Sequence, residues 1–152
     1  MSRKEQAMAY FKEGYNCAQS VFLAFSDMTG FDRKTALRLT APFGGGIARQ
    51  REVCGAVSGM CLAAGALYGY DDLSDSSAKA AHYKLVRALC DEFRKRAGGS
   101  IICRDLLGSE GKDTTATPAA RTEEYYKKRP CAELVGEAVD ILEAYIKENP
   151  LD

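Results

Sequence analysis

The residues of this chain best suited to chemistry are its six cysteines, because a thiolate can attack disulfides and bind metal ions. They are Cys17, Cys54, Cys61, Cys90, Cys103 and Cys131. No two of them form a C-x-x-C motif, and its absence argues against a zinc ribbon or a thioredoxin-like motif. Any reactive pair or cluster must therefore be assembled by tertiary packing.

Four of the cysteines lie in or beside the first turn of a predicted helix: Cys17, Cys54, Cys103 and Cys131. Free backbone amides and the helix dipole stabilise a thiolate there, and can lower a cysteine pKa from about 8.5 to roughly 3.5–7.5. These four are the predicted catalytic residues.

The other two cysteines, Cys61 and Cys90, lie on apolar stripes inside predicted helices, where buried cysteine is usually a packing residue. Cys54 and Cys61 cannot form a disulfide on one continuous helix, since seven residues at about 1.5 Å per residue separate their Cα atoms by roughly 10 Å.

A glycine run with two arginines precedes Cys54. Gly44, Gly45 and Gly46 let backbone amides converge, while Arg49 and Arg51 add positive charge ahead of a helix start. This segment is predicted to bind an anion or to support a thiolate. It is not a P-loop, because no Lys-Ser/Thr pair follows. The alternative is a turn whose glycines permit positive φ and tight packing.

His82 is the single histidine and the one candidate base for Cys–His chemistry. It falls on the apolar face of a predicted helix, which is typical of a residue at the edge of the core. Its role stays open.

Helical periodicity dominates the chain, and no stretch alternates apolar and polar residues as a strand does. We expect one all-α domain over residues 1–152, a bundle of about five to seven helices around a central helix rich in small residues. Helices are predicted near residues 3–12, 16–30, 32–40, 52–69, 76–96 and from 130 on, with a short turn at 100–108 that Ser100 caps. Residues 108–120 are predicted to form a mobile loop or a lid.

Composition narrows the function classes. The chain has 21 Lys+Arg and 21 Asp+Glu, so a formal net charge of zero gives no electrostatic reason to bind nucleic acid. Residues 53–70 are uncharged but rich in Gly, Ala and Ser, which disfavours a membrane span. The first residues lack the apolar run of a secretory signal, so we expect a cytoplasmic, reducing location. Gly55 and Gly59 could pack against an internal neighbour or form a homodimer.

The stretches EGYNCAQSV, APFGGGIARQREVCGAVSG and SIICRDLLG, with a cysteine opening the last helix, resemble a family of redox-active helical proteins named for its C-GCAxxG-C-C pattern. The resemblance implies that Cys17, Cys54, Cys103 and Cys131 act together in a redox role. The central motif here reads CGAxxG, because Val53 stands where the name would place glycine.

Three hypotheses follow. The first is a thiol redox protein with dithiol/disulfide chemistry, with Cys54 as nucleophile, Cys17 or Cys103 resolving the intermediate, and a redox partner or small-molecule substrate. The second is a protein in which Cys17, Cys54, Cys103 and Cys131 bind zinc or an iron–sulfur cluster. The third is a helical interaction protein whose cysteines only pack.

Overall fold

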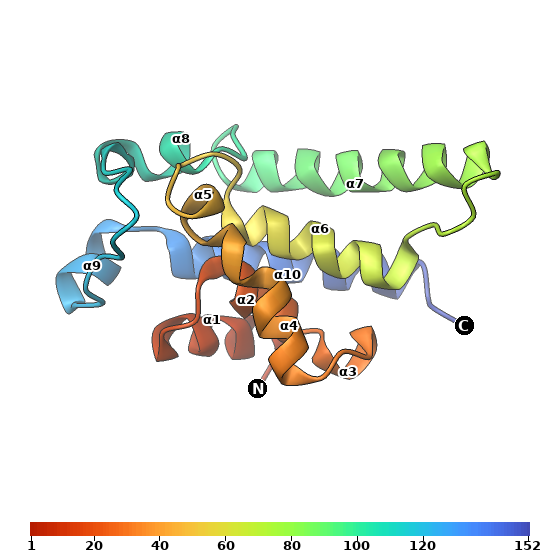
Figure 1. Cartoon of the computed structure of the whole chain (residues 1–152), viewed down its shortest axis with the longest axis horizontal. Helices are drawn as coiled ribbons and strands as arrows, with labels where there is room; N and C mark the ends of the chain where they lie inside the picture. The colour runs from red at the N-terminus through yellow and green to blue at the C-terminus, as the bar shows by residue number, and fades with distance from the viewer.

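The computed structural model describes residues 1–152, which are 70% helical and contain no strand, so the expected all-α class is confirmed. Helix α6 (Gly55–Tyr68) packs against α2 (Cys17–Leu23), α7 (Ser76–Arg96) and α10 (Cys131–Glu148). Helix α1 (Arg3–Glu13) lies along α10, and α4 (Arg33–Thr40) lies on α2 (Figure 1). These six longer helices form the bundle.

The predicted helix starts in the first third of the chain are confirmed by their caps. The Ser2 hydroxyl accepts from the Glu5 amide, Asn16 and Gln19 form a capping box, and Asp32 accepts from the Thr35 amide. Each cap satisfies a backbone amide that lacks a partner within its helix.

The single helix expected over residues 16–30 is instead two, α2 and α3 (Ser26–Thr29). Phe25 has non-helical backbone angles at the break, and two carbonyl oxygens there accept side-chain hydrogen bonds. The Ser26 hydroxyl donates to the Leu23 oxygen at 2.5 Å, and Arg3 Nη1 donates to the Ala24 oxygen at 2.7 Å.

The small residues of α6 allow close approach to α2, as predicted. A Cβ added at Gly59 would lie 2.6 Å from the Ala18 oxygen, and one at Gly55 would lie 3.0 Å from the Cys17 Cβ. The Gly55 and Gly59 face therefore packs against an internal neighbour. Helix α6 begins at Gly55 rather than near residue 52, because Val53 forms an isolated antiparallel bridge with Ile102.

The second half of the chain agrees with prediction in its long helices and differs in its short ones. Helix α7 spans the predicted residues, and α8 (Cys103–Leu107) follows. The expectation that Ser100 caps α8 is wrong, since its hydroxyl accepts from the Ile102 amide and donates to Asp105. Pro130 is the residue before α10 rather than its first residue.

Residues 108–128 are more regular than the predicted loop. Residues Gly108–Lys112 form a 3-10 turn, η2, and a short helix, α9 (Glu123–Lys128), was not predicted. The Thr122 hydroxyl caps α9, and Lys128 pairs with Glu124 one turn earlier. Residues between η2 and α9 carry no regular element.

The short elements gather at one end of the molecule. Helices α5 (Gly44–Ile47), α8 and α9 lie together on the left of Figure 1, beside the starts of α6 and α10. Cys54, Cys103 and Cys131 belong to the single hydrophobic core. None of the helices combines the length and the apolar character that a membrane crossing requires.

Candidate functional site

Four cysteines meet at one pocket of about 280 Å³. Cys17, Cys103 and Cys131 are the first residues of α2, α8 and α10, and Cys54 is the residue that precedes α6. The prediction that these four lie at helix starts is therefore confirmed. All four line the pocket as free thiols, and all except the partly exposed Cys17 are buried.

Backbone pairing places Cys54 beside Cys103. The Cys54 amide donates to the Ile101 oxygen at 2.8 Å, and the Cys103 amide donates to the Glu52 oxygen at 2.6 Å, on either side of the Val53–Ile102 bridge. Cys54 and Cys103, almost 50 positions apart in sequence, are thus brought to the same pocket by the backbone hydrogen bonds between their segments.

A left-handed backbone run shapes one wall of the pocket. Gly45 and Gly46 have φ of 67° and 72°, as the glycine run predicted, but Ile47, Ala48, Arg49 and Arg51 also have positive φ. Such values cost free energy for residues with a Cβ, and clusters of them mark places where surrounding structure holds the backbone for a purpose. Here the run delivers two arginine side chains into the pocket.

Only glycine fits at position 46. A Cβ there would lie 2.6 Å from the Glu52 amide nitrogen and 2.8 Å from the Cys103 Cβ. Gly44 and Gly45 line the pocket directly. The glycine run thus lets the left-handed turn press against the Cys103 segment.

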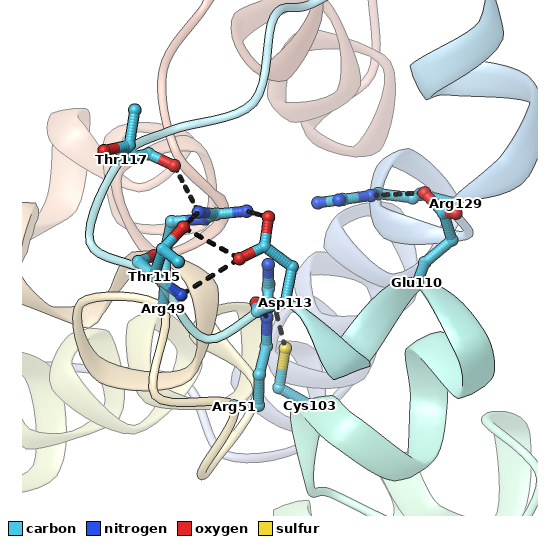
Figure 2. Close-up of polar contacts among 8 residues, drawn as sticks. All are labelled: Arg49, Arg51, Cys103, Glu110, Asp113, Thr115, Thr117 and Arg129. Carbon is cyan, nitrogen blue, oxygen red and sulfur yellow. Dashed lines mark hydrogen bonds and ion pairs between the residues drawn. The ribbon is translucent and has the colours of Figure 1, made fainter.

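Arg49 and Arg51 are buried and hold residues 113–117 over the pocket (Figure 2). Arg49 donates to the Thr115 and Thr117 oxygens and pairs with Asp113 at 3.4 Å. Arg51 Nε donates to the backbone oxygen of Asp113 at 3.0 Å, and Arg51 Nη1 lies 3.7 Å from Cys103 Sγ. Part of the predicted loop is therefore tied to the arginines, while its mobility remains a prediction.

Two further arginines, which the sequence reasoning missed, complete the pocket. Arg121 donates to the backbone oxygens of Phe11 and Tyr15 at 2.8 and 3.2 Å. Arg129 donates to the carboxylate of Glu110 at 3.1 Å. Arg129 lies two residues before Cys131, and Arg51 lies three residues before Cys54. An arginine just ahead of a cysteine at a helix start is therefore the sequence signal that could have identified Arg129 as a pocket residue.

The four thiols differ in their tendency to ionise. Burial raises the pKa of Cys54 to about 12, because the loss of water outweighs the nearby Ala56 and Val57 amides. Burial likewise raises the pKa of Cys103 against the opposing effect of Arg51. The neighbouring Cys131 thiol, followed by burial, raises the pKa of Cys17 well above its usual value.

Cys131 behaves in the opposite way. The Cys17 thiol beside it lowers the pKa of Cys131, and the charges of Arg129, Arg121 and Arg51 act in the same direction against burial. Cys131 is thus the pocket thiol best able to exist as a thiolate. The expectation that Arg49 and Arg51 activate Cys54 does not match this geometry, because the thiol that Arg51 contacts is Cys103.

The two remaining cysteines meet elsewhere. Cys61 on α6 and Cys90 on α7 place their sulfur atoms 4.0 Å apart, and both side chains are partly exposed. His82 does not line the thiol pocket. It lies in a separate surface hollow beside Tyr70, with ring centroids 6.0 Å apart.

The side-chain positions do not form a metal site. No group of three or more His, Cys, Asp or Glu side chains is arranged closely enough to hold a metal ion. The four pocket thiols converge on one cavity without forming such a group.

Comparison with known proteins assigns the chain to a protein family. The sequence model of a family described as "Putative redox-active protein (C_GCAxxG_C_C)" matches residues 15–145. The chain belongs to this family. Its matched region contains all four pocket cysteines and both arginine pairs. Neither a curated protein nor a solved structure matches the chain.

Proposed function

We propose that this member of the C_GCAxxG_C_C family is a cytoplasmic thiol redox protein that reduces a small-molecule disulfide in its four-cysteine pocket. The observation that carries the proposal is geometric: Cys131 and Cys17 open helices α10 and α2 at one pocket, which four arginines also line. The lowered pKa of Cys131 beside the raised pKa of Cys17 agrees with this arrangement. Efficient thiol–disulfide exchange needs one thiolate and one neighbouring thiol held in reserve.

The reaction starts at Cys131. Its thiolate Sγ attacks one sulfur of the substrate, the substrate S–S bond breaks, and the departing thiolate takes up a proton as the first thiol product. Cys131 is left in a mixed disulfide with the other half of the substrate. Cys17 then loses its proton and attacks Cys131 Sγ, which expels the second half as a thiol.

The balance of the cycle is simple. The substrate gains two electrons and two protons, and the protein is left with a Cys17–Cys131 disulfide. A dithiol reductant must restore the two thiols before the next turn. The size of the pocket, about 280 Å³, and the burial of three of its four thiols favour a small molecule over a protein as the substrate.

Cys54 and Cys103 have a different part in this scheme. Both are buried and hold their protons, as the raised pKa of each indicates. They pack in the pocket wall as part of the hydrophobic core and take no part in the exchange. This replaces the sequence-based choice of Cys54 as the nucleophile.

The test counts thiols released in one turnover. The background is a chain with Cys61→Ala and Cys90→Ala, which removes the second thiol pair. The fully reduced protein is mixed with bis(2-hydroxyethyl) disulfide, and the thiols released in the fast phase are counted. We expect two thiols per chain, one after Cys17→Ser is added, and none after Cys131→Ser is added. Two thiols from the Cys131→Ser protein, or no fast phase in any protein, would refute the proposal.

A further inference from the structure

The guanidinium of Arg51 is buried with part of its hydrogen-bonding capacity unused. Arg51 is 2% exposed, and its Nη2 atom has no hydrogen-bond partner. Its other contacts are the Asp113 backbone oxygen and Cys103 Sγ. A buried charged donor without a partner is costly, so such a group calls for a ligand that satisfies it.

The charges around the pocket are unbalanced. Four arginines line it, and no Asp or Glu does. Arg49 pairs with Asp113 and Arg129 pairs with Glu110, both from outside the lining. Arg51 and Arg121 have no carboxylate partner, and Arg121 donates to the backbone oxygens of Phe11 and Tyr15. Two of the four positive charges therefore have no carboxylate partner, and the Cys131 thiolate of the proposed function can balance only one of them.

We infer that the pocket binds an anion, and that the substrate of the proposed function is a small disulfide bearing a carboxylate, which Arg51 holds. The inference rests on the proposed function for the disulfide and on Arg51 for the carboxylate. A guanidinium with free donors matches the two oxygens of a carboxylate, and arginine recognises that group more specifically than lysine does.

The rest of the pocket suits the body of such a molecule. Ala116 comes from the segment that Arg49 and Arg51 hold, Pro118 and Ala119 follow that segment directly, and Leu106 and Leu107 come from α8. A few placed polar groups in a mainly apolar hollow are typical of a small-molecule site. The carboxylate end would face Arg51, next to Cys103, and the sulfur atoms would reach Cys131 within the same cavity.

The first measurement uses ligands that cannot react. Suberate is 3,3′-dithiodipropionate with both sulfur atoms replaced by carbon, and 1,6-hexanediol is the matching analogue of bis(2-hydroxyethyl) disulfide. Calorimetry on the reduced protein at low ionic strength should show saturable binding of suberate that weakens with salt, and binding of 1,6-hexanediol at least tenfold weaker. Equal binding of the two, or no binding of suberate, would overturn the inference.

Variants assign the binding to Arg51. Arg51→Met should weaken suberate binding about tenfold or more, whereas Arg87→Met removes an exposed arginine on α7 and should leave it unchanged. If Arg51→Met fails to fold, Arg51→Lys keeps the charge but not the paired donors and should still lose affinity. Unchanged binding in a folded Arg51 variant would place the anion elsewhere and contradict the assignment.

A kinetic series separates this inference from the proposed function. The reduced protein is mixed with 3,3′-dithiodipropionate, bis(2-hydroxyethyl) disulfide or cystamine, which are anionic, neutral and cationic. We expect the anionic disulfide to react at least tenfold faster than the neutral one, and cystamine to react slowest. Reaction without this order would overturn the anion inference alone. No reaction of any disulfide, together with tight suberate binding, would overturn the proposed function alone.

A second inference stands on different residues. We propose that Cys61 and Cys90 form a second redox site, in which hydrogen peroxide converts the two thiols to a disulfide that joins α6 to α7. Their sulfur atoms are 4.0 Å apart on adjacent helices, and both side chains are partly exposed, so peroxide can reach them. Neither residue lines the four-cysteine pocket.

The chemistry of this second site balances in two steps. The Cys90 thiolate attacks one peroxide oxygen, the O–O bond breaks, and the departing hydroxide becomes water on taking a proton, which leaves a sulfenic acid. Cys61 Sγ then attacks that sulfur, the S–S bond forms and a second water leaves. Cys90 is the attacking thiol because the Cys61 thiol beside it lowers the pKa of Cys90 to about 7, which the charge of Arg94 assists.

The test treats the full-length reduced protein with hydrogen peroxide and maps its peptides. We expect a linked peptide pair containing Cys61 and Cys90, and a rise in the melting midpoint on the order of 10 °C, because the bond closes a loop of 29 residues. In Cys61→Ala a sulfenic acid should be trapped at Cys90, whereas Cys90→Ala should leave Cys61 as a thiol. Recovery of both cysteines as thiols after the pocket cysteines have been oxidised would overturn the proposal.

Discussion

The molecule contains two groups of close thiols whose surroundings differ in almost every respect. The pocket group lies at four helix starts, among arginines, around a cavity large enough for a small molecule. The pair Cys61 and Cys90 lies in the middle of two packed helices and lines none of the described cavities. Room for a ligand and four lining arginines, rather than the proximity of thiols, therefore distinguish the pocket group from the pair Cys61 and Cys90.

The largest expected difference between the two groups is in turnover of a small disulfide. With a dithiol reductant supplied, Cys131→Ser should lower the rate at least a thousandfold, because it removes the attacking thiolate. Cys90→Ala should retain at least half of the rate. The measurement is steady-state kinetics on proteins of equal melting midpoint. A comparable loss in both variants would erase the distinction between the two groups.

The second expected difference is in pH-dependent labelling. The pKa of Cys90 is about 7 and that of Cys54 is about 12. A thiolate fraction rises as the pH increases through the pKa, so iodoacetamide should label Cys90 with a half-maximal rate near pH 7. Cys54 should react at least about a hundredfold more slowly than Cys90 at that pH, because almost all of the Cys54 thiol is protonated. Mass spectrometry of timed samples between pH 5 and 9 measures both. Faster labelling of Cys54 than of Cys90 at pH 7 would reverse the comparison.

Two glycines with positive φ, one crowded beside the pocket and one in open space, are expected to differ in their effect on stability. Gly46→Ala puts a Cβ at φ +72° against the Glu52 amide and the Cys103 Cβ, and should lower the free energy of unfolding by about 3 kcal/mol. Gly98, which follows α7, has φ +88° and no atom within contact distance of an added Cβ. Gly98→Ala should therefore lower the free energy of unfolding by only about 1 kcal/mol. Urea unfolding of both variants tests this. Equal losses would mean that crowding next to Cys103 contributes nothing.

The smallest expected effect separates two helix caps. Asn16→Ala removes the capping box in front of Cys17, and Asp75→Ala removes the cap of α7, so each should cost about 1 kcal/mol of stability. Asn16 also lines the pocket and donates to the Ala41 oxygen, so only Asn16→Ala should slow disulfide turnover. Slower turnover in Asp75→Ala, at the same stability as Asn16→Ala, would contradict this prediction, because it would show that the pocket depends on the distant start of α7.

The placement of Cys17 and Cys131 at helix starts could be predicted from sequence, because local signals set those starts. The starts of α6 and α8 could be predicted only approximately, because the Val53–Ile102 bridge delays α6 and Ser100 does not cap α8. Asn16 with Gln19 and the position of Pro130 mark where α2 and α10 begin, independent of tertiary packing. The extent of α7 follows in the same way from its cap and periodicity. The convergence of the four thiols was implied by the family resemblance and not by any spacing.

The contact between Cys61 and Cys90 could not be predicted in this way. Helical periodicity placed each on an inner face, but the offset between α6 and α7 depends on how residues 69–75 join them. The left-handed run through Ile47, Ala48 and Arg49 was equally hidden, because propensity assigns positive φ to glycine and not to such residues. The proposal of Cys131 rather than Cys54 as the nucleophile rests on the positions of Cys17, Arg129 and Arg121 around Cys131, which depend on tertiary packing.

The most direct test of the central claim is to identify the disulfide that forms when the reduced protein reacts with one equivalent of 3,3′-dithiodipropionate. The reaction is stopped with acid, free thiols are blocked with an alkylating reagent, and the peptides are mapped by mass spectrometry. We expect a Cys17–Cys131 bond as the first protein disulfide, with Cys61 and Cys90 recovered as thiols. A first disulfide between Cys61 and Cys90, or one that leaves Cys131 as a free thiol, would contradict it.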